Sequence, residues 1–218
     1  MSTKPLHLFC ILLGCTPKGR NTEQHDVMFA VASNIEELYA EMKLFWYKPI
    51  VEDIVQVLKK SIPGLDSKAL SNELLAKWST RDKVHIDAWM KVEYVDGCKV
   101  VIAPRSNTTS NSAKLYFVNL GGYKEGEFEE FHKKMFVVAN SVTDVAAKLR
   151  HHPFMKEHTP QALGTKAKAH FDDKHHIQFE ADDIVCVQDI VGYNIQLVPG
   201  AKYMENETMI GYVPLQYK

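Results

Sequence analysis

The chain has 218 residues, enough for one large domain or two small ones with a real hydrophobic core. Its formal net charge is -1, from 26 basic and 27 acidic residues. Because neither half carries the excess of Lys and Arg that neutralises phosphates, we expect no nucleic-acid partner. Every apolar run is far shorter than the roughly 18 residues of a membrane span, so we also expect no membrane insertion.

The N-terminal run admits two interpretations. Residues 6–19 read LHLFCILLGCTPKG, and Leu12-Leu13-Gly14-Cys15 resembles the site at which bacterial lipoprotein signals are cut. The alternative is a short buried strand closed by glycine. The polar start holds one lysine, Lys4, and His7 interrupts the apolar run, which favours the strand.

An internal similarity decides between these interpretations. When residues 13–42 are placed over residues 120–149, at a constant shift of 107 residues, ten of the 30 columns are identical. The identical pairs are Leu13/Leu120, Gly14/Gly121, Gly19/Gly126, Glu23/Glu130, His25/His132, Met28/Met135, Phe29/Phe136, Val31/Val138, Ala32/Ala139 and Ala40/Ala147. A cleaved signal would not have an internal counterpart, so we expect a duplicated, cytoplasmic protein whose first strand is the N-terminal run.

The similarity continues towards the C-terminus and sets the expected boundaries. It matches His85-Ile86-Asp87 with His170-Phe171-Asp172, and residues 95–104 with residues 190–199. We expect a first repeat over residues 5–104, a polar linker over 105–113, a second repeat over 114–200 and a C-terminal tail over 201–218.

Each repeat is predicted to have the order β-β-α-β-β. Short apolar runs predict the strands, Ser33 and Glu36 have capping-box spacing before the first helix, and Asp96-Gly97 predicts a tight hairpin turn. Helical periodicity over residues 50–79 predicts an insert in the first repeat alone. The expected fold class is α+β, with two tandem repeats packed in pseudo-twofold symmetry.

These motifs resemble a known family. Both copies carry Leu-Gly, a further glycine, E-x-H and M-F-x-V-A, and the sequence is thereby similar to the duplicated bacterial family called domain of unknown function 1543. The resemblance implies this organisation and a bacterial, cytoplasmic setting. It implies no catalytic residues, because the family has no established activity.

The repeated polar residues are the candidates for chemistry. Residues two apart on a strand share a face, so the two side chains of such a pair can point the same way. The repeated pairs with this spacing are Glu23 and His25, Glu130 and His132, His85 and Asp87, and His170 and Asp172. If the strands adjoin, each repeat gathers two imidazoles and two carboxylates, a set that suits zinc, manganese or iron. The simpler interpretations are that these side chains bind backbone groups of the long loop, or that they form a structural pair. We therefore predict no cofactor and leave a divalent metal open.

The repeated glycines are predicted to lie in turns. Gly14, Gly19, Gly121, Gly122 and Gly126 are interpreted as turn residues that adopt positive φ. A phosphate-binding loop is the alternative, but the Lys-Ser pair of such a loop is absent from the sequence and acidic residues crowd around positions 125–130.

Two functions of different class remain. The first is a non-enzymatic protein that binds a small ligand or assembles with another subunit, including a second copy, with contacts extended by Tyr203, Tyr212 and Tyr217. The alternative is a metal-dependent enzyme of hydrolase type that uses the repeated E-x-H and H-x-D residues.

Overall fold

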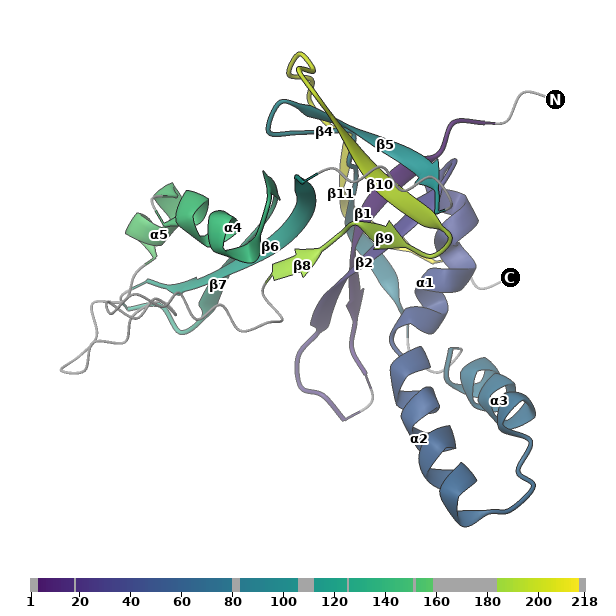
Figure 1. Ribbon diagram of the computed structural model, residues 1–218. Coiled ribbons are helices and arrows are strands. Elements are labelled where there is room, and N and C mark those ends of the chain that lie inside the picture. Colours follow the sequence, from purple (N-terminus) through teal and green to yellow (C-terminus); the bar gives the residue numbers. More distant parts are fainter. Residues whose placement is uncertain are drawn as a thin grey trace. The chain divides into compact units, whose positions relative to one another are not determined.

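The computed structural model describes residues 4–17, 19–79, 83–105, 112–124, 126–150, 152–158 and 184–215 (Figure 1). The chain forms two compact units, Met1–Val92 with Asn206–Lys218, and Glu93–Glu205. The fold is α+β, with antiparallel sheets and a few helices. In the described part of the chain, no helix is both long and apolar enough to cross a membrane.

The first unit is built on a four-stranded sheet with the order β11-β3-β1-β2. Its strands are β1 (His7–Cys15), β2 (Gln24–Ala32), β3 (His85–Lys91) and β11 (Thr208–Pro214). The strand β1 has a partner on each side, and its residues are buried or half-buried, which explains why its sequence is a continuous apolar run. The N-terminal run is therefore a central strand.

A short helical stretch covers one face of this sheet. The helix η1 (Ile35–Leu38) continues into α1 (Tyr39–Phe45), and Ile35, Leu38 and Met42 pack with alternate residues of β1 and β2. The N-cap is Asn34, one residue later than the predicted Ser33; its Oδ1 accepts a hydrogen bond from Glu37 N at 3.2 Å. The cap shifts because Ser33 instead donates its hydroxyl to the Glu37 carboxylate, at 2.6 Å.

The segment of the predicted helical insert contains α2 (Lys48–Ser61) and α3 (Ser67–Ser79), which lie side by side (Figure 1). Val51 and Val55 of α2 pack against Leu74 and Trp78 of α3. Asp66 accepts backbone hydrogen bonds at the start of α3.

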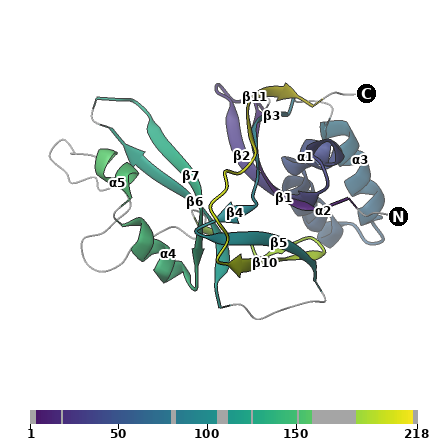
Figure 2. The same cartoon turned by 90° about the horizontal axis from the view of Figure 1, so that it is seen from above.

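The described part of the second unit holds two antiparallel sheets. The first has the order β7-β6-β8, with β6 (Lys114–Tyr123), β7 (Glu130–Ala139) and β8 (Ile184–Cys186). The helices α4 (Val142–Leu149) and α5 (Pro153–Glu157) pack their apolar side chains against β6 and β7 (Figure 2).

The two long hairpins have the same register. His7 pairs with Ala32 in the β1–β2 hairpin, and Lys114 pairs with Ala139 in the β6–β7 hairpin. Both residues of the second pair are shifted by 107 from those of the first, which is the shift found in the sequence. Gly14 therefore lies opposite His25 just as Gly121 lies opposite His132.

The closing hairpins of the two predicted repeats share one sheet, with the order β4-β5-β10-β9. Its strands are β4 (Tyr94–Val95), β5 (Cys98–Pro104), β9 (Asp189–Ile190) and β10 (Tyr193–Pro199). The β5–β10 pairing runs from Cys98↔Pro199 to Pro104↔Tyr193, and Val101↔Gln196 lies at its centre. The first compact unit ends at Val92, because β5, the last strand of the repeat predicted over residues 5–104, pairs with β10.

The C-terminal segment differs from the expected tail. Residues 208–214 form β11, which pairs with β3 from Thr208↔Met90 to Pro214↔His85. This pairing joins residues more than 110 positions apart, and a short segment without clear alternation gives little sign of it. Within the predicted linker, residues 106–111 lie outside the described residues.

Candidate functional site

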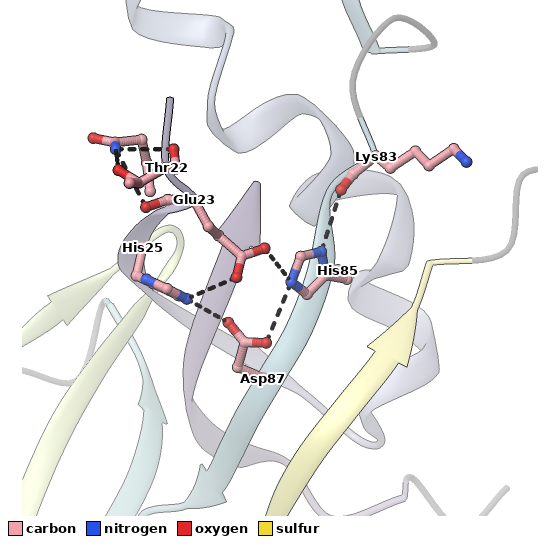
Figure 3. Close-up of polar contacts among 7 residues, drawn as sticks. Thr22, Glu23, His25, Lys83, His85 and Asp87 are labelled. Atoms are coloured by element: carbon pink, nitrogen blue, oxygen red, sulfur yellow. Dashed lines mark hydrogen bonds and ion pairs between the residues drawn. The ribbon is translucent and has the colours of Figure 1, made fainter. Parts of the chain in front are cut away.

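Four polar side chains of the first unit contact one another at the end of its sheet (Figure 3). His85 Nε2 lies 2.9 Å from Glu23 Oε1 and 3.3 Å from Asp87 Oδ1. His25 Nε2 lies 3.5 Å from Glu23 Oε2 and 3.2 Å from Asp87 Oδ2. Each imidazole thus contacts both carboxylates, and we call these four residues the histidine–carboxylate ring.

Gly14 makes room for the ring. On β1 it pairs with His25 on one side and with His85 on the other. A Cβ atom at this position would lie 2.5 Å from His85 Nε2 and 2.6 Å from Asp87 Oδ2, closer than any real contact. The missing side chain therefore lets residues from the two flanking strands meet above the central strand.

This finding corrects the prediction for three of the five glycines. Gly19 and Gly126 have positive φ, as turn residues do, but Gly14 lies within β1, and Gly121 and Gly122 lie within β6. A Cβ at Gly121 would lie 2.6 Å from the Glu130 carboxylate, and one at Gly122 would lie 2.7 Å from a backbone oxygen of α5's C-terminal cap. The prediction was wrong because a close approach between strands leaves no mark in local sequence.

Two β-bulges flank Asp87. Leu12 pairs with Ala88 and Leu13 pairs with Ile86, so Asp87 has no partner on β1. On the other side of β3, the pairing with β11 jumps from Ile210 to Val213. Bulges redirect side chains and occur next to functional sites, so this part of the sheet departs from regular geometry where the ring forms.

His85 is the most restrained member of the ring, with 5% of its surface exposed. Its Nδ1 lies 3.2 Å from Lys83 O, and because a carbonyl oxygen only accepts, Nδ1 donates the hydrogen. The ring of Tyr212 lies against the imidazole, with centroids 4.4 Å apart and planes tilted by 37°. Nε2 is thereby directed at the carboxylates. Sequence reasoning missed the Lys83 carbonyl and named Tyr212 only as a contact residue of the tail, since the contacts of both with His85 arise from strand pairing and backbone position.

The contact between His85 and Glu23 has a chemical consequence. An unprotonated Nε2 at 2.9 Å from a carboxylate oxygen would set two lone pairs against each other, so a proton or a cation must lie between them. Asp87 Oδ2 is buried and, although 3.2 Å from His25 Nε2, has no hydrogen-bond partner among the described residues. The ring therefore concentrates negative charge and nitrogen lone pairs in a small space.

The distances between the donor atoms of the ring suit a metal ion, but the directions in which the side chains point do not. A tetrahedral zinc site with bonds of 2.0–2.1 Å has donors about 3.3 Å apart, and the ring contacts span 2.9–3.5 Å. The side chains nevertheless point at one another. Within the described ranges, no group of three or more His, Cys, Asp and Glu side chains is already arranged to hold a metal ion. A metal would require small side-chain rotations towards a common centre.

The second unit brings together only part of the corresponding set. His132 Nε2 lies 3.9 Å from Glu130 Oε2, and the amide of Asn119 lies 3.1 Å from His132 Nδ1. His170 and Asp172 lie outside the described residues and stay a prediction. Tyr116 is the counterpart of Phe9 at the shift of 107 residues. Phe9 pairs with Lys91 and Tyr116 pairs with Cys186, so Cys186 on β8 corresponds to Lys91 on β3. This correspondence relates β8 to β3 by a shift of 95 residues. The sequence match of His85 with His170 used a shift of 85 residues, so the two correspondences differ by ten residues.

The fold and the ring define an α+β protein with a polar site at the end of an antiparallel sheet. Residues 20–51 match the family model described as Domain of Unknown Function (DUF1543), which is the family that the repeated motifs resemble. This segment contains Glu23 and His25 of the ring.

The solved structures extend the comparison to the whole chain. The chain is similar to the crystal structure of a protein Il1583 from Idiomarina loihiensis, with 21% sequence identity and a TM-score of 0.54. The match covers 98% of this chain and 99% of the other. The two proteins thus share a fold. No curated protein matches the sequence.

Proposed function

We propose that this protein is a non-enzymatic binding protein whose histidine–carboxylate ring holds one divalent transition-metal ion. The observation that carries the proposal is the approach of His85 Nε2 to Glu23 Oε1, at 2.9 Å, while Nδ1 donates to Lys83 O. A metal ion bound by Nε2 and the carboxylate removes the conflict between their lone pairs. A hydrogen bond from the other ring nitrogen to a backbone carbonyl is the usual support of a histidine ligand.

The charge and chemistry of the ring support a divalent cation. Two carboxylates contribute two negative charges, which one divalent ion neutralises, and a partly buried carboxylate such as Asp87 gains most from that neutralisation. Two imidazole nitrogens with two carboxylate groups form a ligand set suited to zinc, manganese or ferrous iron.

The exposure of the ring is uneven. The side chains of His25 and Glu23 are 44% and 40% exposed, whereas His85 is buried beneath Tyr212. An ion can therefore reach the ring from the side of β2 without opening the core. A bacterial, cytoplasmic setting belongs to this proposal through the family resemblance, and cell fractionation tests the cytoplasmic location.

A titration tests the proposal. Metal-free protein is titrated with Zn²⁺, Mn²⁺ and Fe²⁺ by calorimetry, and one ion per chain is expected for at least one of them. His85→Ala and Asp87→Asn should weaken binding by at least about 100-fold, since even the supports of metal ligands are worth about 10–100-fold. His132→Ala is the matched control, because His132 is similarly exposed in the second unit. Absence of stoichiometric binding, or equal loss in the control, contradicts the proposal.

A hydrolase is the second candidate, and the exposure of His25 favours it. A metal ion held by His85 and the carboxylates would keep a position open to solvent, and a water bound there becomes a nucleophile near neutral pH. Turnover of p-nitrophenyl phosphate or acetate by metal-loaded protein, lost in Asp87→Asn, would favour the enzyme. Native mass spectrometry of the same samples tests the predicted homo-oligomer.

A further inference from the structure

We infer that Tyr212 is a positioning residue of the histidine–carboxylate ring. In this inference its aromatic ring holds the His85 imidazole so that Nε2 faces Glu23 and Asp87. Strand β11, which lies outside both sequence repeats, thereby completes the site. The inference rests on the proposed metal-binding function, because positioning of Nε2 matters for a ligand that Nε2 binds.

The contact itself is specific. The ring centroids of Tyr212 and His85 are 4.4 Å apart and the planes are tilted by 37°, so the two rings lie in close contact in a tilted arrangement. Tyr212 remains 63% exposed, so burial in the core does not explain its place. Its neighbour on the same strand, Ile210, is 86% exposed and belongs to no core cluster. The contact with His85 distinguishes Tyr212 from the rest of the exposed part of β11.

The backbone of β11 has a bulge at Tyr212, where this contact is made. Between Ile210↔Ala88 and Val213↔Ile86, two residues of β11 face the single residue Asp87 of β3. The first of the two, Gly211, has φ of +143°, a conformation that side chains disfavour. The extra residue redirects the strand at Tyr212, as bulges do.

Three restraints then act on one imidazole. Lys83 O fixes Nδ1, Gly14 leaves space for Nε2, and Tyr212 lies against the ring. Removing the aromatic ring should leave His85 free to rotate away from Glu23. The phenol hydroxyl has no part in the argument, so phenylalanine should replace tyrosine.

The experiment compares Tyr212→Ala, Tyr212→Leu and Tyr212→Phe with Ile210→Ala, the control on the same exposed strand. In metal-free protein, the His85 Hε1 resonance reports the neighbouring aromatic ring by its ring-current shift. We expect this resonance to move in the Ala and Leu variants and to stay in the Phe variant and the control. With Zn²⁺, the Ala and Leu variants should bind about 10-fold more weakly, at the lower end of the range for residues that orient metal ligands, and Phe should restore the affinity.

Each outcome bears on a definite statement. An unchanged His85 resonance in Tyr212→Ala and Tyr212→Leu overturns the inference, whatever the protein binds. If the wild type does bind zinc, but no more tightly than Tyr212→Ala, the inference is overturned as well. If the resonance moves while the wild type binds no metal, the proposed function fails, and what stands is the contact of Tyr212 with the His85 imidazole. The Leu variant keeps apolar packing on the strand, so loss of folding in the Ala variant does not stop the test.

Discussion

The ring in the first unit and its counterpart in the second begin from the same hairpin and end differently. Gly14, Glu23 and His25 have the same register as Gly121, Glu130 and His132. In the first unit, β3 adds His85 and Asp87, and the carboxylates contact two imidazoles. The described part of the second unit shows a glutamate and a histidine 3.9 Å apart. The β1–β2 hairpin therefore supplies the glycine and half of the ring, and β3 supplies the other half.

A second difference lies beneath the histidine. Asn119 holds His132 in the second unit, and the equivalent position of the first unit, at the same shift of 107, is the apolar Leu12. The amide gives His132 a fixed partner on its own sheet. His25 instead finds its contacts in the carboxylates of the ring. The same histidine thus contacts an amide in one unit and two carboxylates in the other.

The largest expected effect comes from filling the glycine positions. Gly14→Ala places a Cβ against the buried His85, so we expect a loss of about 1–3 kcal/mol in unfolding free energy, as for overpacked sites, and loss of metal binding. Gly121→Ala meets only the end of the Glu130 side chain, which can rotate away, so we expect a near-neutral effect. All three tryptophans lie in the first unit. Tryptophan fluorescence in urea should therefore shift for Gly14→Ala alone; equal shifts would contradict the comparison.

The helix caps should behave alike in the two units. Asn34 accepts from Glu37 N at 3.2 Å and Ser141 accepts from Asp144 N at 3.1 Å. Replacing either by alanine should reduce stability by about 1 kcal/mol, a typical value for a lost cap. Chemical denaturation followed by circular dichroism measures it, with the exposed Thr143→Ala as a near-neutral control. A cost confined to one unit would show that only one helix depends on its cap.

A smaller effect is expected from exchanging the residue beneath the histidine. Asn119 Oδ1 is buried and has no hydrogen-bond partner within the described ranges. Asn119→Leu introduces the residue of the first unit, and we expect a gain of about 0.5 kcal/mol, because an unpaired buried oxygen is removed. His132 is 41% exposed, so water can replace the lost amide. A clear loss of stability in thermal unfolding would instead show that the amide orders this region.

The smallest effect concerns pH. Hydrogen bonds from the Ser33 hydroxyl and backbone lower the pKa of Glu37 from 4.5. A carboxyl group with a lowered folded-state pKa stabilises the fold above its unfolded value, and this contribution is lost as pH falls through the folded value. Glu37→Gln should therefore be less stable than the wild type at neutral pH, and the difference should vanish well below pH 4.5. Denaturation series across this range measure it, and a difference independent of pH would exclude Glu37 ionisation as the cause.

Much of the fold could be predicted because its causes are local. The apolar run of β1, the periodic residues of α1 and the Asp96-Gly97 turn depend on neighbours a few residues away, and both turn residues have the expected positive φ. The shift of 107 residues between the repeats is also the shift between the registers of the two long hairpins.

The sequence predicted which residues belong to the candidate site, but not how they are arranged. The sequence singled out Glu23, His25, His85 and Asp87, because polar residues two apart on a strand share a face. It could not show that β1 separates the two pairs, nor that Gly14 allows them to meet across it. Tyr212 was noticed only as an exposed aromatic residue.

The amino-acid sequence by itself determined most strands and the main helices, which follow from short-range pattern, and the candidate polar residues, which follow from the internal repeat. Only the tertiary structure decided that β5 pairs with β10, that β11 joins β3, and that four side chains close a ring over a glycine. The physical reason is that these contacts join segments separated by about 60 to more than 110 residues. Their free energy comes from pairing and close packing in three dimensions, which leave no periodic trace along the chain.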